Sequence, residues 1–215
     1  MKVYGAILSP FVRKVLAACE LKGLAYEHEM IMPGTKTPEF LAMSPLGKIP
    51  ALEDGELRIS DSSVICEYLE EKYPENSLLP ATPELRARAR WYEEYGDSTV
   101  ASCVAVFFFE RVVKSMMGMG NADEARLAEV AATEHPEVFG YLESQLPEQG
   151  FLFGDTLSVA DLSLANPFIN ASYGRFALDA DSWPRTAAWL ERVKSDPVLV
   201  GLLAAEKALM EQMAA

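Results

Sequence analysis

Hydrophobic and polar residues alternate with different periods along the first third of the chain. Residues 3–8 are a short apolar run, which is typical of a buried strand. From residue 10 onward apolar positions recur at helical spacing; Pro10 fits the first position of a helix and Gly23 fits its C-terminal cap. Residues 26–30 alternate as a half-buried strand does. The pattern therefore predicts a strand, a helix and a strand in succession.

A hairpin and another helix are predicted next. Two apolar runs, residues 49–52 and 57–59, flank an Asp-Gly pair, which favours a tight turn between two strands. Asp61 then precedes an apolar helical face that Pro74 ends. The resulting order, βαβ-ββα, is that of a thioredoxin-like domain, which we expect to occupy residues 1–77.

Beyond the prolines near residue 80, all of the patterning is helical. We expect a linker at residues 78–84 and an all-helical bundle domain over residues 85–215, so the fold class is α/β followed by all-α. Ser158 and Asp161 resemble a capping box with aspartate in place of glutamate, which predicts a helix start. Further helices are predicted over residues 83–117 and 123–146, with an interruption near Pro136, and from Pro184 and Pro197.

Composition narrows the classes of protein that the chain can represent. Half of the 215 residues are hydrophobic, which is enough for a sizeable core. The formal net charge of −13, without any basic stretch, argues against a nucleic-acid partner and against binding to anionic membranes. No signal peptide and no apolar run of membrane-spanning length appears, so a cytoplasmic location is expected.

The cysteines and histidines suggest neither disulfides nor a metal site. Cys19, Cys66 and Cys103 are odd in number, far apart and set in apolar helical segments, so we expect buried, reduced thiols. His28 and His135 have no neighbours at ligand-like spacing, and no metal is expected.

The most informative segment joins the first strand to the first helix. Its sequence, Leu-Ser-Pro-Phe-Val-Arg-Lys from residue 8, places the hydroxyl of Ser9 at a helix start. Unpaired N–H groups and a partial positive charge stabilise anions there, thiolates included. A thiol-disulfide oxidoreductase of this design needs Cys-x-x-Cys at the turn, but Ser9 and Val12 stand there instead. The site therefore suits the thiolate of another molecule.

Two more features converge on this helix start if the domain folds as expected. The Ile49-Pro50 bond is a candidate cis peptide, which would turn the backbone of Ile49 outward to pair with an extended peptide ligand. A trans proline at the edge of a strand is the alternative, although the flanking motifs favour cis. Asp61 and Ser62 offer a carboxylate for an ammonium group and a helix start for a carboxylate, which together match an α-amino-acid end. Plain N-capping by either residue is the alternative.

Four motifs follow one another in a specific order and spacing. They are Ser-Pro-Phe-Val-Arg-Lys from Ser9, Ser-Pro-Leu-Gly-Lys-Ile-Pro-Ala-Leu from Ser44, Ser-Asp-Ser-Ser-Val-Ile-Cys-Glu-Tyr-Leu from Ser60, and Gly-Asp-Thr-Leu-Ser-Val-Ala-Asp from Gly154. None of these motifs identifies a protein family by itself, whereas the four together, in this order and spacing, do. Through this set, the chain resembles a cytosolic glutathione S-transferase of the serine type along essentially its whole length.

The resemblance implies a role for each matching position. Ser9 matches the serine that hydrogen-bonds the sulfur of glutathione. Tyr4 is its rival, because other classes of the family use a tyrosine on the first strand. Arg13 either adds positive potential or pairs with an acid elsewhere, and Asp61 stands where the family more often has glutamate. The implied glutathione-binding residues are Lys36, Lys48, Ile49, Pro50, Asp61 and Ser62, with the two lysines either at the glycine carboxylate or simply solvated.

The resemblance also implies an activity and partners. We expect glutathione as the co-substrate, a hydrophobic electrophile as the second substrate, a peroxide as a further target, and a two-fold homodimer. The alternative is a protein of the same fold that binds glutathione or apolar ligands, or serves as a scaffold, without useful turnover. Candidates for the electrophile site, or simply for the helical core, are Trp91, Tyr95, Phe107, Phe108 and Arg111.

Overall fold

In the computed structural model, which describes residues 1–214, the first strands form a four-stranded mixed sheet. β1 (Lys2–Tyr4) runs parallel to β2 (Glu27–Glu29) and antiparallel to β3 (Ala51–Asp54), and β3 pairs with β4 (Leu57–Ser60), giving the order β2-β1-β3-β4. The predicted βαβ unit and hairpin are therefore confirmed. β1 is shorter than the predicted apolar run, because the chain turns after Tyr4 on its way to the first helix.

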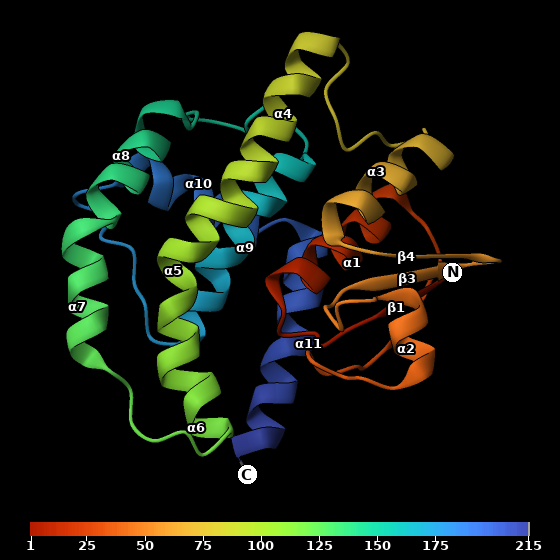
Figure 1. Cartoon of the computed structure of the whole chain (residues 1–215). Helices are drawn as coiled ribbons and strands as arrows, with labels where there is room; N and C mark the ends of the chain where they lie inside the picture. Colours follow the sequence, from red (N-terminus) through yellow and green to blue (C-terminus); the bar gives the residue numbers. More distant parts are fainter. Residues whose placement is uncertain (215) are drawn as a thin grey trace. The chain divides into compact units, whose positions relative to one another are not determined.

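Two helices pack together on one face of the sheet (Figure 1). α1 (Pro10–Lys22) has Ser9 as its N-cap, proline at its first position and Gly23 in the left-handed conformation at its end, as predicted. α3 (Ser62–Lys72) begins after Asp61. Two of the candidate residues, Ser9 and Asp61, therefore stand directly before the first residues of α1 and α3.

The other face of the sheet carries α2 (Pro38–Met43), which is a single short helix (Figure 1). Its Phe40 and Met43 pack on Tyr4 of β1 and Ala51 of β3. Tyr4 and Ala51 are paired in the register of the sheet, so their side chains lie on the same face. The burial of this small cluster fixes α2 against the sheet.

The last helix, α11 (Pro197–Ala214), packs against α1. By its contacts the chain divides into one compact unit, made of Met1–Pro80 and the chain from Ser195 onward, and a second made of Ala81–Lys194. The second unit covers most of the helical domain expected over residues 85–215, and the bounds of that domain stay a prediction. A buried ion pair links α11 to α1: the guanidinium of Arg13 donates to both carboxylate oxygens of Glu206, at 2.6 and 2.5 Å.

The second unit consists of helices. A long helical run begins at Thr82 and contains two short π-helical segments, at which side-chain rows shift by one position. The predicted interruption near Pro136 lies at Glu134, between two helices. The elements are α4 (Pro83–Tyr95), η1 (Gly96–Val100), α5 (Ala101–Phe108), η2 (Phe109–Val113), α6 (Lys114–Met116), α7 (Glu124–Thr133), α8 (His135–Gln145), α9 (Val159–Tyr173) and α10 (Pro184–Lys194).

The core of the second unit is organised around α9. The predicted capping box is present: Asp161 receives hydrogen bonds from the N–H and hydroxyl of Ser158 at 3.0 and 2.6 Å. The same carboxylate also accepts from the indole of Trp189 at 3.0 Å. At Gly96 the long helix approaches α9 so closely that a Cβ would lie 2.6 Å from the carbonyl oxygen of Ser163. Both features make α9 a structural element, as the capping motif suggested.

Within residues 1–214, no helix combines the length and the apolar character that crossing a lipid bilayer requires.

Candidate functional site

Ser9 occupies the N-cap position of α1, where its side chain is half-buried. Its Oγ accepts a long hydrogen bond from the N–H of Val12, at 3.4 Å. A serine hydroxyl also carries one proton to donate, and no acceptor for that proton is found among residues 1–214. The hydroxyl is therefore available as a donor at the positive end of the helix.

Gly5, at the end of β1, brings the start of α1 next to the segment before β3. A Cβ at Gly5 would lie 2.4 Å from Cγ2 of Val12 and 3.2 Å from Cβ of Ile49, so only glycine fits between them. The Ile49-Pro50 bond is cis, as the sequence predicted. Ile49 is thus a close neighbour of the first turn of α1.

Asp61 lies beside the same segment, because its N–H points to the carbonyl oxygen of Pro50 at 3.4 Å. Its φ of 86° is unusual for a residue with a side chain. Its Oδ1 accepts from the N–H groups of Ser63 and Val64 at 3.0 and 3.2 Å, so Asp61 is the N-cap of α3. The side chain is exposed, and no partner for Oδ2 is found within the described chain.

The structure therefore brings five of the candidate residues together. Ser9 is the N-cap of α1, Ile49 flanks Gly5 together with Val12 of that helix, and Pro50 meets the backbone of Asp61. Ser62 follows as the first residue of α3 and is almost fully buried. The arrangement presents one hydroxyl donor, one free carboxylate oxygen and two helix starts along one edge of the first unit.

The two candidate lysines lie on loops that touch each other. The N–H of Gly34 donates to the carbonyl oxygen of Gly47 at 3.0 Å, which places Lys36 and Lys48 on adjoining loops. The hydroxyl of Ser44 fixes the second loop by donating to the carbonyl oxygen of Lys48 at 2.7 Å. Both lysine side chains are exposed, and neither forms an ion pair with another described residue. They can meet an anionic ligand group, and they can equally remain solvated.

Tyr4, the rival of Ser9, has its hydroxyl on the face of the sheet that α2 covers. The hydroxyl lies 3.5 Å from Oε2 of Glu53 and lines a cavity of about 290 Å³, together with Glu29 and Arg58 among others. Burial, followed by the negative charge of Glu53, raises the pKa of Tyr4. A tyrosine with these neighbours is poorly suited to stabilise a second anion.

Sequence reasoning missed a further residue near the site, Lys14. Its side chain is 1% exposed, and its Nζ donates to the hydroxyl of Ser63 on α3 at 3.1 Å. Arg13, for which two roles were open, is fully buried and pairs with Glu206. A buried ammonium is rare unless hydrogen bonds compensate its desolvation, so Lys14 has a specific place in the fold.

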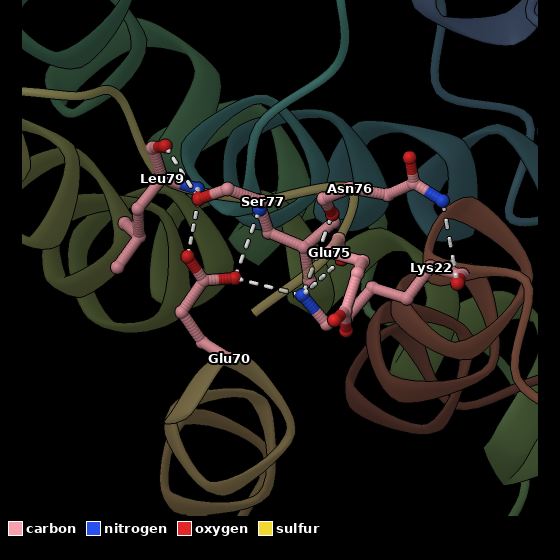
Figure 2. A network of polar contacts seen from close by, with 7 residues as sticks. Lys22, Glu70, Glu75, Asn76, Ser77 and Leu79 are labelled. Carbon is pink, nitrogen blue, oxygen red and sulfur yellow. Dashed lines mark hydrogen bonds and ion pairs between the residues drawn. The ribbon is translucent and has the colours of Figure 1, made fainter. Parts of the chain in front are cut away.

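The opposite ends of α1 and α3 are joined by a buried ion pair (Figure 2). Nζ of Lys22 lies 3.0 Å from Oε2 of Glu70. The same ammonium donates to the carbonyl oxygens of Glu75 and Asn76 at 3.2 and 3.4 Å. All three hydrogens of the ammonium thus have an acceptor, which offsets the cost of burying it.

Glu70 also fixes the chain that leaves the sheet region (Figure 2). Its carboxylate accepts from the hydroxyl of Ser77 and, at 3.0 Å, from the N–H of Leu78. Burial alone would raise the pKa of Glu70, but these hydrogen bonds and Lys22 lower it below its ordinary value. Leu78 and Leu79 are buried, so the first part of the expected linker at residues 78–84 is packed and hydrogen-bonded.

The five candidates for the electrophile site all lie in the second unit. Phe107 is buried and packs on Phe176 with ring centroids 4.9 Å apart, which makes it a core residue. The guanidinium of Arg111 donates to both carboxylate oxygens of Glu124, at 3.0 and 2.7 Å. The other three, Trp91, Tyr95 and Phe108, remain at least partly exposed.

The cysteines match the prediction. All three thiols are buried and free of disulfide bonds, and burial raises the pKa of Cys19 and of Cys103 to about 12. The thiols of Cys19 and Cys103 are therefore protonated and unreactive at neutral pH. Among residues 1–214, no group of three or more His, Cys, Asp or Glu side chains is arranged to hold a metal ion.

The fold is a thioredoxin-like sheet domain followed by helices, and Ser9 caps its first helix. Residues 3–77 match the family description "Glutathione S-transferase, N-terminal domain", and residues 108–206 match "Glutathione S-transferase, C-terminal domain". A glutathione S-transferase from Hyoscyamus muticus is 31% identical over 205 residues, which cover 92% of this chain and 94% of the relative. The chain belongs to the glutathione S-transferase family.

Further relatives show which activities and which fold occur among proteins similar to this chain. A maleylacetoacetate isomerase from Pseudomonas aeruginosa is 32% identical over 192 residues, covering 86% of this chain and 87% of the relative. The crystal structure of a glutathione S-transferase from Rhodospirillum rubrum F11 matches with a TM-score of 0.82 at 31% identity, covering 94% of this chain and 91% of that one. The predicted fold class is confirmed. The family binds glutathione, and its members include both transferases and an isomerase.

Proposed function

We propose that this protein is a glutathione transferase, which joins the thiolate of glutathione to a hydrophobic electrophile. The observation that carries the proposal is the hydroxyl of Ser9, a donor at the positive end of α1. A sulfur anion beside it would receive a charge-assisted hydrogen bond and the field of the helix start. The thiolate is the nucleophile, so stabilising it at neutral pH is the central requirement of the reaction.

The energies involved are sufficient for this role. A thiol of ordinary pKa is only a few per cent ionised at neutral pH, and lowering its pKa by about two units requires roughly 2.7 kcal/mol. A hydrogen bond to a charged group contributes about 1.5–3 kcal/mol. A helix start adds about 0.3–1 kcal/mol. Serine acts here as a donor and not as a base, because its hydroxyl ionises far less readily than the thiol.

The remaining candidates are proposed to bind the rest of glutathione. The exposed Oδ2 of Asp61 would accept from the ammonium of the γ-glutamyl group, and the start of α3 at Ser62 would bind its carboxylate. The backbone of Ile49, before cis Pro50, would pair with the cysteinyl unit. Lys36 and Lys48 would meet the glycine carboxylate.

The proposal extends to partners and location. We place the hydrophobic electrophile on the helical unit and include peroxides among the targets, which implies a detoxifying role. We propose a homodimer. We also propose a cytoplasmic location, because members of this family are usually cytosolic. Family membership and the chemistry of the site support these parts of the proposal.

A second candidate function is isomerisation, which the relative from Pseudomonas aeruginosa favours. A glutathione thiolate that adds to a cis double bond and then leaves again returns the trans isomer, with no net consumption of glutathione. The same Ser9 donor would serve this reaction. The two activities differ only in whether the sulfur remains bonded to the product.

A binding and turnover experiment tests the proposal. Calorimetry with glutathione is followed by assays with a chromogenic chloronitrobenzene and with maleylacetoacetate. Saturable conjugation of the aromatic substrate supports a transferase, and turnover of maleylacetoacetate alone supports the isomerase. Glutathione binding without turnover of either substrate would favour the scaffold alternative, and absence of glutathione binding would overturn the proposal.

A further inference from the structure

Lys14 connects the two helix starts that form the proposed glutathione site. It lies on α1 five residues beyond Ser9, and it reaches Ser63 two residues beyond Asp61 on α3. We propose that Lys14 is a positioning residue for glutathione, which holds the γ-glutamyl end of the site at a fixed place relative to the sulfur end. This inference rests on the proposed function, because it concerns the same site.

Two hydrogen bonds carry the connection. Nζ of Lys14 donates to the hydroxyl of Ser63 at 3.1 Å, and the N–H of Ser63 donates to Oδ1 of Asp61 at 3.0 Å. Ser63 is therefore bonded on one side to α1 and on the other to the carboxylate that would accept the ammonium of glutathione. A shift of Ser63 would move Asp61 with it.

The burial of Lys14 makes this connection rigid. The side chain is 1% exposed, although a lysine ordinarily keeps its ammonium in water. A buried ammonium retains its place only where hydrogen bonds replace its hydration. Glutathione affinity should depend on this connection, because a site whose two ends are already held at the correct spacing loses less conformational freedom when the ligand binds.

The same pair of helices supplies a matched control. Lys22 is also a buried lysine of α1, and it also reaches α3, through Glu70. It lies eight residues after Lys14, or about 12 Å further along the helix axis. If lysines of α1 only fasten the two helices together, Lys14 and Lys22 should affect glutathione binding equally. If Lys14 sets the geometry of the site, only Lys14 should.

The experiment measures glutathione affinity, kcat and KM for five variants in the full-length protein. Lys14→Met and Ser63→Ala should each weaken glutathione binding roughly tenfold, with kcat at saturating glutathione within about twofold of the native value. The double variant should be no weaker than either single variant, because both remove the same bond. Ser63→Thr, which retains a hydroxyl, should keep native affinity. Lys22→Met should lower thermal stability and leave the affinity unchanged.

A second ligand sharpens the result. Affinity for γ-glutamylcysteine, which has the γ-glutamyl end and lacks the glycine, should fall by the same factor in Lys14→Met as affinity for glutathione. Native affinity in Lys14→Met, or an equal loss in Lys22→Met, would overturn the inference while leaving the proposed function intact. If Lys14→Met does not fold, native affinity in Ser63→Ala overturns it equally. Failure of the native protein to bind glutathione would instead remove the proposed function, and this inference with it.

Discussion

The two ends of the α1–α3 pair are built in opposite ways. At the starting end, Ser9 keeps a donor proton and Asp61 keeps a carboxylate oxygen without partners in the described chain. At the far end, Lys22 and Glu70 are buried and their polar atoms are occupied by each other and by residues 75–78. One pair of helices thus combines an end that is open to a ligand with an end that is closed.

This difference explains how a polar site coexists with a stable sheet domain. Unsatisfied polar groups cost free energy only when water cannot reach them, so the open end remains inexpensive while it is exposed. At the closed end the charged side chains of Lys22 and Glu70 are buried, and their polar atoms must therefore be paired. We therefore expect changes at the closed end to affect stability and changes at the open end to affect activity.

The largest expected effect is the loss of folding stability in Glu70→Ala, at the closed end. This change leaves the buried ammonium of Lys22 without its carboxylate, which should lower the free energy of unfolding by about 3–5 kcal/mol. Chemical denaturation measures the loss, and kcat/KM of the folded fraction should be unchanged. Lys72→Ala is the control, because its pair with Asp54 at 2.7 Å is partly exposed and solvent-screened and should therefore contribute far less to stability. Equal losses in the two variants would contradict the distinction between the two ends.

The next largest effect is expected for Ser9→Ala. Loss of a charge-assisted hydrogen bond of about 1.5–3 kcal/mol should reduce turnover roughly tenfold to a hundredfold and raise the pKa of the bound glutathione thiol by about one to two units. The pH profile of kcat and the ultraviolet absorbance of the thiolate measure these changes. Glutathione affinity below the thiol pKa should stay near the native value, and Ser9→Thr should retain most of the activity. Native turnover in Ser9→Ala would move the role to Tyr4 or to a backbone N–H.

A smaller effect is expected for Asp61→Asn. The amide oxygen can still accept from the N–H groups of Ser63 and Val64, so the cap of α3 survives and stability should change by less than about 0.5 kcal/mol. Removal of the negative charge should weaken glutathione binding several-fold, because the proposed ammonium contact loses its ionic part. Calorimetry at low salt measures the affinity. A loss of stability without a loss of affinity would show that Asp61 serves only as a cap.

The smallest expected effect is the loss of folding stability at the closed end when the pH is lowered. Because the pKa of Glu70 is lower in the folded protein than its ordinary value, its contribution to stability is complete above about pH 5 and is lost as the pH falls through its folded pKa. The loss should be smaller than in Glu70→Ala, since the protonated side chain still fills its place. Unfolding measured between pH 6 and 3 should be less steeply pH-dependent in Glu70→Gln than in the native protein. Identical pH profiles would exclude Glu70 as a source of acid sensitivity.

Local signals predicted most of the fold. Pro10 and Gly23 delimit α1, Gly55 and Glu56 form the hairpin turn directly after Asp54, and Ser158 caps α9, each through backbone groups within a few residues. In such cases the residues that determine the local structure lie within a few positions of one another, so the sequence shows them directly. The cis bond before Pro50 was also predicted, from motifs that flank it.

The buried charges could not be predicted in the same way. Arg13 lies 193 residues from its partner Glu206, and Lys22 lies 48 residues from Glu70. Nothing near these cations in the sequence indicates that they are buried, because charged residues ordinarily stay at the surface. For the same reason the sequence does not indicate that α11 packs against α1. The roles of Ser9, the two lysines on adjoining loops and the other candidate binding residues stay predictions, since contacts within the chain do not identify a ligand.

The pairing of Arg13 with Glu206 also constrains how the protein is made. The carboxylate that completes the burial of this guanidinium lies 193 residues further along the chain, so it leaves the ribosome long after Arg13 does. The sheet region, although synthesised earlier, therefore cannot reach its final packing before Glu206 has been translated. A transcript truncated before the codon for Glu206 would yield a product whose first unit lacks that partner, and cellular proteases would meet it as an incompletely folded protein.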